Sequence, residues 1–392
     1  MIETSSTRRT LILVLVVLQS ALAPIVVSGL IPNYMDHLTR TFHATRGDIG
    51  AVLALMVLFS AAFGLLAGLL AERIGNERVL LVAIAGQALT IGLFTFVDAR
   101  WAAVLLAFLF YSTKNMTAVA NALSTDFFTH SQNRGVNLLH AVNAVGKLIG
   151  PLVALAFALA WRWSFFATGI FGLLILASAF FAFRGPVHHV RSNGLRPEPI
   201  LHRPFFWLLI NGFTLLVAAE LSVTVWLPTF LMKVRSFSGD TAKLLHACFM
   251  AGLVSAHFAT VLVGYRLRHR HIISVCLACT LFLFPALFLR HPLLIAACLF
   301  FHGASFSATY PTYFSYITRF FPTHVSALSG GSALTTSLGY AVAYFVSGWI
   351  SDFSPTWAVL IGPVCMAAFA VLFVALLRHE SRTLSAVPCA GG

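Results

Sequence analysis

Long apolar runs recur along the whole chain, and each is long enough to cross a lipid bilayer as a helix. A helix needs about 20 residues to span the hydrocarbon core. Only 9% of the 392 residues are charged and 59% are hydrophobic, whereas soluble domains carry roughly 25% charged residues. The chain is therefore predicted to be an all-α membrane protein. The twelve predicted spans cover residues 11–31, 48–71, 79–97, 101–124, 136–158, 164–183, 205–230, 243–265, 272–289, 293–317, 326–349 and 357–377.

The longest polar stretch, "RGPVHHVRSNGLRPEPILHR", divides these spans six and six. We expect an N-terminal six-helix bundle over 1–183, a cytoplasmic linker over 184–203, and over 204–392 a C-terminal six-helix bundle with a short tail. Basic residues are more numerous on the side that holds the N-terminus, which predicts an inner-membrane protein with both termini cytoplasmic. The net charge of +13 then reflects topology. Nucleic-acid binding is not expected, because no soluble basic domain is evident.

The first span has a rival interpretation. Arg8, Arg9, the apolar run and "ALA" at 21–23 are also typical of a cleaved secretory signal. Pro24 directly follows the cleavage position and the apolar run continues to Ile31. We therefore expect an uncleaved first helix.

Motifs for other protein classes are missing from the sequence. There is no Walker A or glycine-rich phosphate loop, so ATP-driven transport is not expected. Cys276 and Cys279 form a C-x-x-C within an apolar helix without a second pair, which favours packing over metal binding. No span carries a Ser/His, paired-Asp or H-E-x-x-H arrangement. We predict that the chain is not an enzyme and holds no metal or cofactor.

The segment after the second span, "GLLAERIGNER", carries a recognisable motif. It resembles the loop 2–3 signature of the major facilitator superfamily, Gly-x-Leu-Ala-Asp-Arg-x-Gly-Arg-Arg/Lys. The resemblance implies a monomeric transporter of two pseudo-symmetric six-helix bundles. A glycine before the acid suits close helix packing, a glycine after it suits a tight turn, and the charges suit a latch that closes the cytoplasmic side. The implied gating residues are Gly68, Glu72, Arg73, Gly75 and Arg78.

Three further segments resemble the fucose–proton symporter branch of that superfamily: "ASFSATYPTYFS" at 304–315, "HAVNAVGKLIGP" at 140–151 and "TAVAN" at 117–121. This resemblance implies sugar symport. Thr117, however, stands where the branch has its proton-binding glutamate, and the first span contains no acid.

Two lysines lie deep within predicted spans. At 1.5 Å per residue, Lys114 and Lys147 both fall near the bilayer midplane, where such transporters bind substrate. Two ammonium groups suit a carboxylate, a phosphate or another anion. A lysine neutralised by burial, or paired with Glu220, is the alternative. The tyrosines of the tenth span suit a cavity wall or helix packing equally. The predicted substrate-binding set is Lys114, Asn121, His140, Asn143, Lys147, Tyr310 and Tyr313.

Glu220 is the one carboxylate deep within a predicted span. It is a candidate proton carrier, because burial and a nearby lysine would shift its proton affinity in opposite directions. A fixed ion pair with Lys114 or Lys147 is the alternative. His257 and His302 are further proton-coupling candidates because histidine titrates near neutral pH, although a histidine within a helix can also simply bond a neighbouring carbonyl.

These features predict a proton-coupled secondary active transporter of a small, polar, anionic solute, working by alternating access. Its partners would be the solute, protons and the lipid bilayer. The alternatives are an efflux antiporter for amphipathic compounds, a sugar symporter, and a transporter-shaped sensor that moves nothing. The efflux alternative is suggested by "GKLIGP" at 146–151, which resembles the glycine–proline signature of antiporters.

Overall fold

The computed structural model describes residues 6–116, 119–120, 123, 132–158, 160–183, 202–263, 266–321 and 325–385. Every regular element in these ranges is a helix. The helices before residue 184 are α1 (Ser6–Pro24), the π-helical segment η1 (Ile25–Leu30), α2 (Ile31–Asn33), α3 (Met35–Thr41), α4 (Arg46–Ile74), α5 (Asn76–Phe94), α6 (Arg100–Met116), α8 (Gln132–Ala156) and α9 (Trp161–Ala182). Those after residue 201 are α10 (Pro204–Lys233), α11 (Gly239–Val263), α12 (His269–Thr280), α13 (Leu283–Phe288), α14 (Pro292–Ser307), α15 (Thr309–Ile317), α16 (Val325–Phe353) and α17 (Pro355–Ser385).

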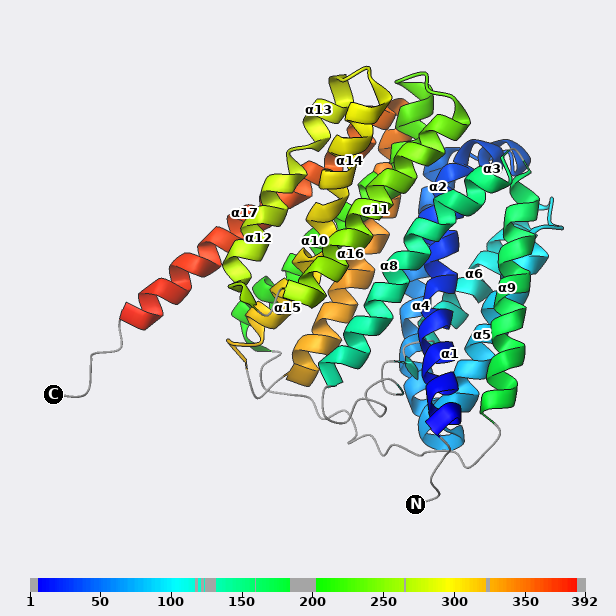
Figure 1. Cartoon of the computed structure of the whole chain (residues 1–392), viewed down its shortest axis with the longest axis horizontal. Coiled ribbons are helices and arrows are strands. Elements are labelled where there is room, and N and C mark those ends of the chain that lie inside the picture. The colour runs from blue at the N-terminus through cyan, green and yellow to red at the C-terminus, as the bar shows by residue number, and fades with distance from the viewer. Residues whose placement is uncertain are drawn as a thin grey trace.

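The helices form two groups, which we call the N half (α1–α9) and the C half (α10–α17). Within the N half, α1 contacts α8 and α9, and α5 contacts α6 and α9; within the C half, α10 contacts α16 and α17, and α11 contacts α14. The halves meet where α4 packs against α16 and α8 against α11. Figure 1 shows α1 beginning on the lower face of the molecule, which we call the near side, whereas α2, α3 and α13 lie on the opposite, far side. The linker boundary stays a prediction, because 184–201 lie outside the described residues.

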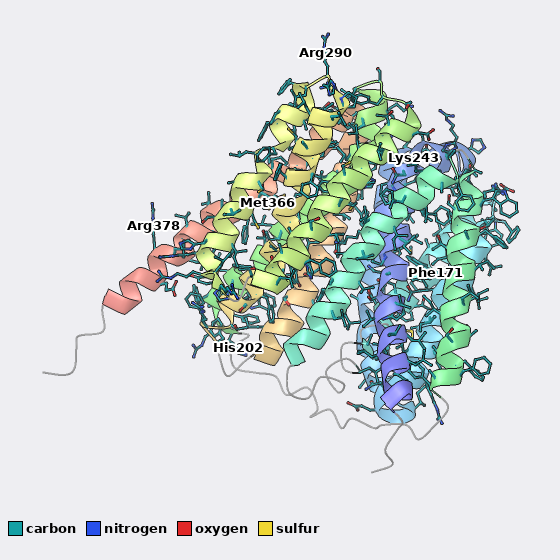
Figure 2. The ribbon with its side chains drawn as sticks, in the orientation of Figure 1. Phe171, His202, Lys243, Arg290, Met366 and Arg378 are labelled. Atoms are coloured by element: carbon teal, nitrogen blue, oxygen red, sulfur yellow. The ribbon has the colours of Figure 1, made fainter. Side chains whose placement is uncertain are left out.

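The prediction of an all-helical membrane protein is confirmed. Ten helical stretches among the described residues are long and apolar enough to cross a bilayer. The other two predicted spans correspond to α6, described over 17 residues, and α16, a 29-residue helix rich in serine, glycine and threonine. Large apolar side chains face outward, as lipid requires; Phe171 on α9, labelled in Figure 2, is one of them.

Two predicted spans are each broken into a pair of helices. The span at 272–289 stops at Thr280 and resumes at Leu283, and the span at 293–317 stops at Ser307 and resumes at Thr309. Each second helix has a proline in its first turn, Pro285 or Pro311. Proline donates no backbone hydrogen bond, and its ring clashes with the carbonyl four residues earlier. The helices break at or next to the residues that carry these carbonyls, Leu281 and Ser307.

Glycines bring α8 close to α1 and η1. A Cβ built on Gly146 would lie 2.4 Å from the carbonyl oxygen of Ala21, and one on Gly150 would lie 2.5 Å from the Cα of Gly29. Only residues without a side chain allow two backbones this near. This crossing fixes the rotation of α8 and so the direction in which Lys147, between the two glycines, projects.

Candidate functional site

An ion pair joins the two halves. The Nζ of Lys147 on α8 donates to Oε1 of Glu220 on α10. The two side chains retain 15% and 20% of their exposure, so water reaches them only in part. Of the alternatives for Glu220, the structure contains the ion pair with Lys147.

Lys114 lies between aromatic rings from both halves. Its Nζ is 5.2 Å from the ring centroid of Tyr111 on α6 and 5.7 Å from that of Tyr340 on α16. Both distances lie within the range of cation–π attraction. The hydroxyl of Tyr111 also lies 3.3 Å from the hydroxyl of Tyr344, a second contact between α6 and α16. The ammonium group is thus held against ring faces that stabilise a positive charge.

We call Tyr111, Lys114, Lys147, Glu220 and Tyr340 the central cluster. The charges of Lys114 and Lys147 act on each other, and the charge of Glu220 acts on Tyr340, so the five residues form one electrostatic unit. The unit contains two ammonium groups and one carboxylate. Either ammonium group would attract an additional anion, which at Lys147 would compete with Glu220.

The polar residues predicted beside Lys147 fall into two positions. His140 on α8 is exposed and lies within electrostatic reach of Lys147 and of His257 on α11 in the other half. Asn143 instead turns toward the first helix, where its Nδ2 donates to the carbonyl of Ser20 at 3.3 Å. His140 and His257 therefore border the central cluster, whereas Asn143 helps to join α8 to α1.

The two tyrosines of the predicted substrate-binding set also lie in different surroundings. Tyr310 is partly exposed and its hydroxyl lies 3.3 Å from Oγ1 of Thr336 on α16. Tyr313 is wholly buried and donates to the carbonyl of Leu209 at 2.8 Å. Tyr313 therefore packs inside the C half, which is the helix-packing alternative for these tyrosines, and its role as a substrate contact stays a prediction. Asn121 lies outside the described residues.

His302 also proves to be a core residue. It is wholly buried on α14, its Nδ1 lies 3.1 Å from the carbonyl oxygen of Thr280, and its ring packs against Phe249 and Phe306. The structure contains the carbonyl contact that is the alternative to a proton-coupling role, and the proton-coupling role of His302 stays a prediction.

The tyrosines of α16 are site residues that sequence reasoning missed. Tyr340 and Tyr344 are four residues apart and so lie on one face of the helix. Two tyrosines at that spacing in a span rich in small polar residues were a usable signal. The face they mark is the one turned toward Lys114 and Tyr111.

An apolar cavity of about 110 Å³ lies inside the N half. Its walls include Val52, Ala103, Ala107 and Phe110, and it extends from the exposed Arg100–Asp48 ion pair to Tyr111. Pockets lined mainly by apolar side chains accept hydrophobic groups. Tyr111 belongs both to the cavity wall and to the central cluster, so a place for apolar groups adjoins a positive charge.

Polar contacts between the halves gather on the far side, where they form what we call the far gate: Asn33, Asp36, Arg46 and Ala158 of the N half with Lys233, Lys243, His246 and Asp352 of the C half. Asp36 accepts from Arg46 at 3.2 Å and from Lys233 at 2.9 Å, so one carboxylate links both halves. Burial alone would raise the pKa of Asp36, but the hydrogen bonds from Lys233 and Arg46 outweigh it and hold this pKa below its usual value.

The start of α4 is held by the opposite half. Oδ1 and Oδ2 of Asp352 accept from the backbone nitrogens of Arg46 and Gly47, each at 2.9 Å. These N–H groups have no partner within their own helix, and the helix dipole favours a carboxylate here. A Cβ on Gly50, one turn later, would lie 2.4 Å from the carbonyl oxygen of Tyr344. Only glycine lets α4 and α16 close to this distance.

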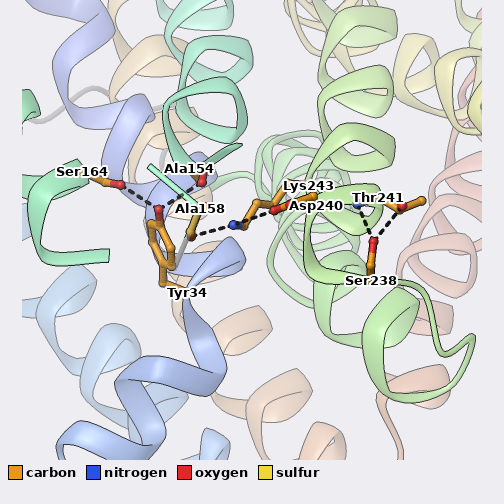
Figure 3. Close-up of polar contacts among 8 residues, drawn as sticks. All are labelled: Tyr34, Ala154, Ala158, Ser164, Ser238, Asp240, Thr241 and Lys243. Carbon is orange, nitrogen blue, oxygen red and sulfur yellow. Dashed lines mark hydrogen bonds and ion pairs between the residues drawn. The ribbon is translucent and has the colours of Figure 1, made fainter. Parts of the chain in front are cut away.

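Lys243 closes the gate at a second point. Its side chain is buried, and its Nζ donates to the carbonyl of Ala158 at 2.7 Å and lies 3.4 Å from Asp240 (Figures 2 and 3). The neighbouring Tyr34 bonds Ser164 at 2.7 Å and the Ala154 carbonyl at 3.1 Å (Figure 3). These contacts tie the segment between α2 and α3 to the far ends of α8, α9 and α11.

The motif residues of the near side lie at the other end of α4. Gly75 has φ 92° and separates α4 from α5, a turn that glycine makes without strain. Glu72, Arg73 and Arg78 are exposed. A Cβ on Gly68 would meet no atom within 4 Å, so the close helix approach expected at this glycine is not present in this conformation.

Solved transporters share this architecture. A mutant of the nucleoside transporter NupG superposes with a TM-score of 0.75 at 14% identity, over 93% of this chain and 100% of that one. A bacterial homologue of the human lysosomal transporter Spinster, in an inward-facing and unoccupied conformation, gives 0.71 at 16% identity, over 95% and 96%. At these identities the likeness concerns the fold.

Sequence relatives are resistance proteins. Multidrug resistance protein MdtG of Dickeya zeae is 25% identical over 279 residues, 67% of either chain. The class E tetracycline resistance protein of Escherichia coli is 25% identical over 256 residues, 62% of either chain. Neither is a fucose symporter, and the branch-level resemblance is corrected accordingly. Residues 16–337 match the profile of the Major Facilitator Superfamily. The chain is therefore a membrane transporter that belongs to the major facilitator superfamily.

Proposed function

We propose that the chain is a proton-coupled efflux antiporter for amphipathic compounds that carry an anionic group. The observation that carries this proposal is the position of Tyr111, which lines an apolar cavity and whose ring centroid lies 5.2 Å from the ammonium nitrogen of Lys114. The cavity suits the apolar part of a compound, and the ammonium group suits its anionic group. The sequence relatives, named for multidrug and tetracycline resistance, support the same class.

Glu220 is the proposed proton carrier. Protonation would remove its negative charge and so weaken its bond to Lys147, the ion pair that links the halves through α8 and α10. Loss of this link would favour separation of the halves. A proton bound in one state and released in the other couples a proton gradient to alternating access. His257 lies close enough to His140 to serve as a second titrating group.

We further propose that the near side faces the cytoplasm, as the distribution of basic residues predicts. The far gate would then face the outside, and the structure would be the state closed to the outside. Support comes from the superposition on a transporter solved in an inward-facing conformation. In this state Glu72 and Arg73 are exposed, as expected of a latch that acts in the opposite state.

A second candidate function is proton symport of a small polar anion. Two lysines in one cluster favour it, because a small carboxylate or phosphate could bind both ammonium groups once Glu220 is protonated. Symport and antiport require pH gradients of opposite direction to accumulate substrate in vesicles. An antiporter accumulates its substrate in vesicles with an acid lumen, whereas a symporter does so in vesicles with an alkaline lumen.

The test uses proteoliposomes and two permanent anions, naphthalenesulfonate as the amphipathic probe and methanesulfonate as the small polar one. We expect naphthalenesulfonate to accumulate in acid-lumen vesicles and methanesulfonate to remain at the level of protein-free vesicles. Accumulation of methanesulfonate in alkaline-lumen vesicles would establish the second candidate instead.

Two variants test the site itself. Lys114→Gln should weaken binding of naphthalenesulfonate by about 1.5–3 kcal/mol, the range for hydrogen bonds to charged groups. Ala107→Phe should fill the cavity and reduce transport of naphthalenesulfonate, whereas Leu105→Phe, at a 50% exposed position on the opposite face of α6, serves as the matched control. Equal transport by both phenylalanine variants would show that the cavity is not part of the substrate site.

A further inference from the structure

A buried polar contact lies within the far gate, between Asn33 at the end of α2 and His246 on α11. Nδ2 of Asn33 is 2.9 Å from Nδ1 of His246, and the two residues are 3% and 0% exposed. The imidazole also stacks on Phe249, with ring centroids 6.3 Å apart and planes 18° apart. The contact joins the two halves and is sealed from water while the gate is closed.

The hydrogen bonds of Asn33 fix the proton of the histidine. Nδ2 of Asn33 also donates to the carbonyl of Gly29 at 2.7 Å, and a carbonyl can only accept. The amide nitrogen therefore points toward both Gly29 and His246, so Nδ1 of His246 must be the acceptor. A neutral histidine meets this requirement with its proton on Nε2.

A protonated His246 does not fit this arrangement. Imidazolium carries a hydrogen on both nitrogens, so its Nδ1–H would face an N–H of Asn33. Turning the amide over would bring its oxygen against the carbonyl of Gly29 instead. Either choice loses a hydrogen bond and leaves two like groups in contact. The closed gate therefore accepts only the neutral form.

The surroundings offer a charged His246 no compensation. Its described contacts are the amide of Asn33 and the ring of Phe249, neither of which carries a charge. Asp240, the acid on its own helix, lies beside Lys243. A buried charge without a partner is strongly unfavourable. The described charged and titratable groups on α11, on the helices packed against it and on the nearby α3 are Asp36, His37 and Arg40 on α3, His140 and Lys147 on α8, Glu220 and Lys233 on α10, Asp240, Lys243, Cys248 and His257 on α11, and Cys298 and His302 on α14.

We propose that His246 is a proton-binding site of the far gate, which takes a proton from the far-side solution when the gate opens and returns it before the gate closes. The site goes beyond the coupling role assigned to Glu220, because proton uptake and release occur on one side and move no net charge. Protonation of His246 changes the ratio of the open to the closed far gate. Acid on the far side would hold the transporter open to that side.

The size of the effect follows from linkage. If the open state has the ordinary histidine pKa of about 6.5 and the closed state excludes the charged form, the open-to-closed ratio rises about tenfold between pH 7.5 and pH 5.5. The direction follows from the proton count: the open state binds the proton and the closed state does not.

The experiment measures the gate without transport. Spin labels on cysteines at Arg40 and Arg290, exposed far-side positions of the two halves, report the gate distance by pulsed electron resonance in a background without native cysteines (Figure 2 shows Arg290). We expect the long-distance population to grow relative to the short one by about tenfold from pH 7.5 to 5.5. His246→Gln should abolish this response, and His37→Gln, a nearby far-side histidine without the Asn33 contact, should retain it.

A second variant separates a proton site from a merely structural contact. Asn33→Asp gives up the hydrogen bond to Gly29 but places a negative carboxylate against Nδ1, which accepts the hydrogen of imidazolium and balances its charge, so the closed gate would then admit protonated His246. The pH response should vanish or reverse in this variant. A wild-type ratio that stays constant across this pH range, or a response that persists in His246→Gln, would overturn the proposal and leave the antiport proposal untouched.

Discussion

Removing one partner of the ion pair between Lys147 and Glu220 should destabilise the protein more than removing both. Breaking a fully buried pair costs about 3–5 kcal/mol, because an uncompensated charge remains. Here the side chains keep 15% and 20% exposure, so we expect about 2–3 kcal/mol for Glu220→Met or Lys147→Met, below that range. For the double variant we expect less than about 1 kcal/mol, since two apolar side chains replace the pair without a residual charge.

The assay is thermal unfolding in detergent, followed by intrinsic fluorescence. With about 2.1 cal/mol/K of unfolding entropy per residue, 2–3 kcal/mol in a chain of 392 residues corresponds to a Tm shift of about 3 °C. Each single variant should therefore melt about 3 °C lower, and the double variant within about 1 °C of wild type. Single losses that simply add in the double variant would show that the two charges do not interact, and the account of the link between halves would fail.

Two further outcomes concern the far gate. Hydrogen bonds from Lys233 and Arg46 lower the pKa of Asp36, so its contribution to closing the gate should be complete at neutral pH and be lost only as the pH falls through this lowered pKa. Asp36→Asn should open the gate at all pH values. The spin-label distance measures both effects, and a gate that stays closed in the variant would contradict the role of Asp36. Gly50→Ala should also shift the population toward the open gate, because its Cβ would meet a backbone carbonyl of α16 at 2.4 Å, while Gly68→Ala on the same helix has open space and serves as the control.

The sequence allowed the class of fold to be predicted, because the period and length of apolar segments are properties of the chain alone. It also indicated two lysines and a glutamate near the middle of the membrane. Which lysine pairs with Glu220 was left open, since that depends on the rotation of each helix about its axis. The structure settles it through the glycine crossing that orients α8. Lys114 is directed instead toward Tyr340, on a helix more than 200 residues later.

The far gate could not be predicted for the same reason. Asn33 and His246, or Arg46 and Asp352, are separated by most of the chain and meet only because two bundles come together at one end. Nothing in the sequence around each of these residues indicates its partner. His302 and Tyr313 show the converse, since their residue types suggested chemistry while their rotations place them in the core.

The start of α4 carries two N-terminal caps. Thr45 and Asp48 form a capping box that moves with the helix, and Asp352 adds a cap from the other half. When the halves separate, the first cap remains, so the helix keeps its first turn while the amides bonded by Asp352 exchange that carboxylate for water. Opening this contact therefore requires no local unfolding. This contact between the halves can therefore form and break in every transport cycle while α4 keeps its own cap.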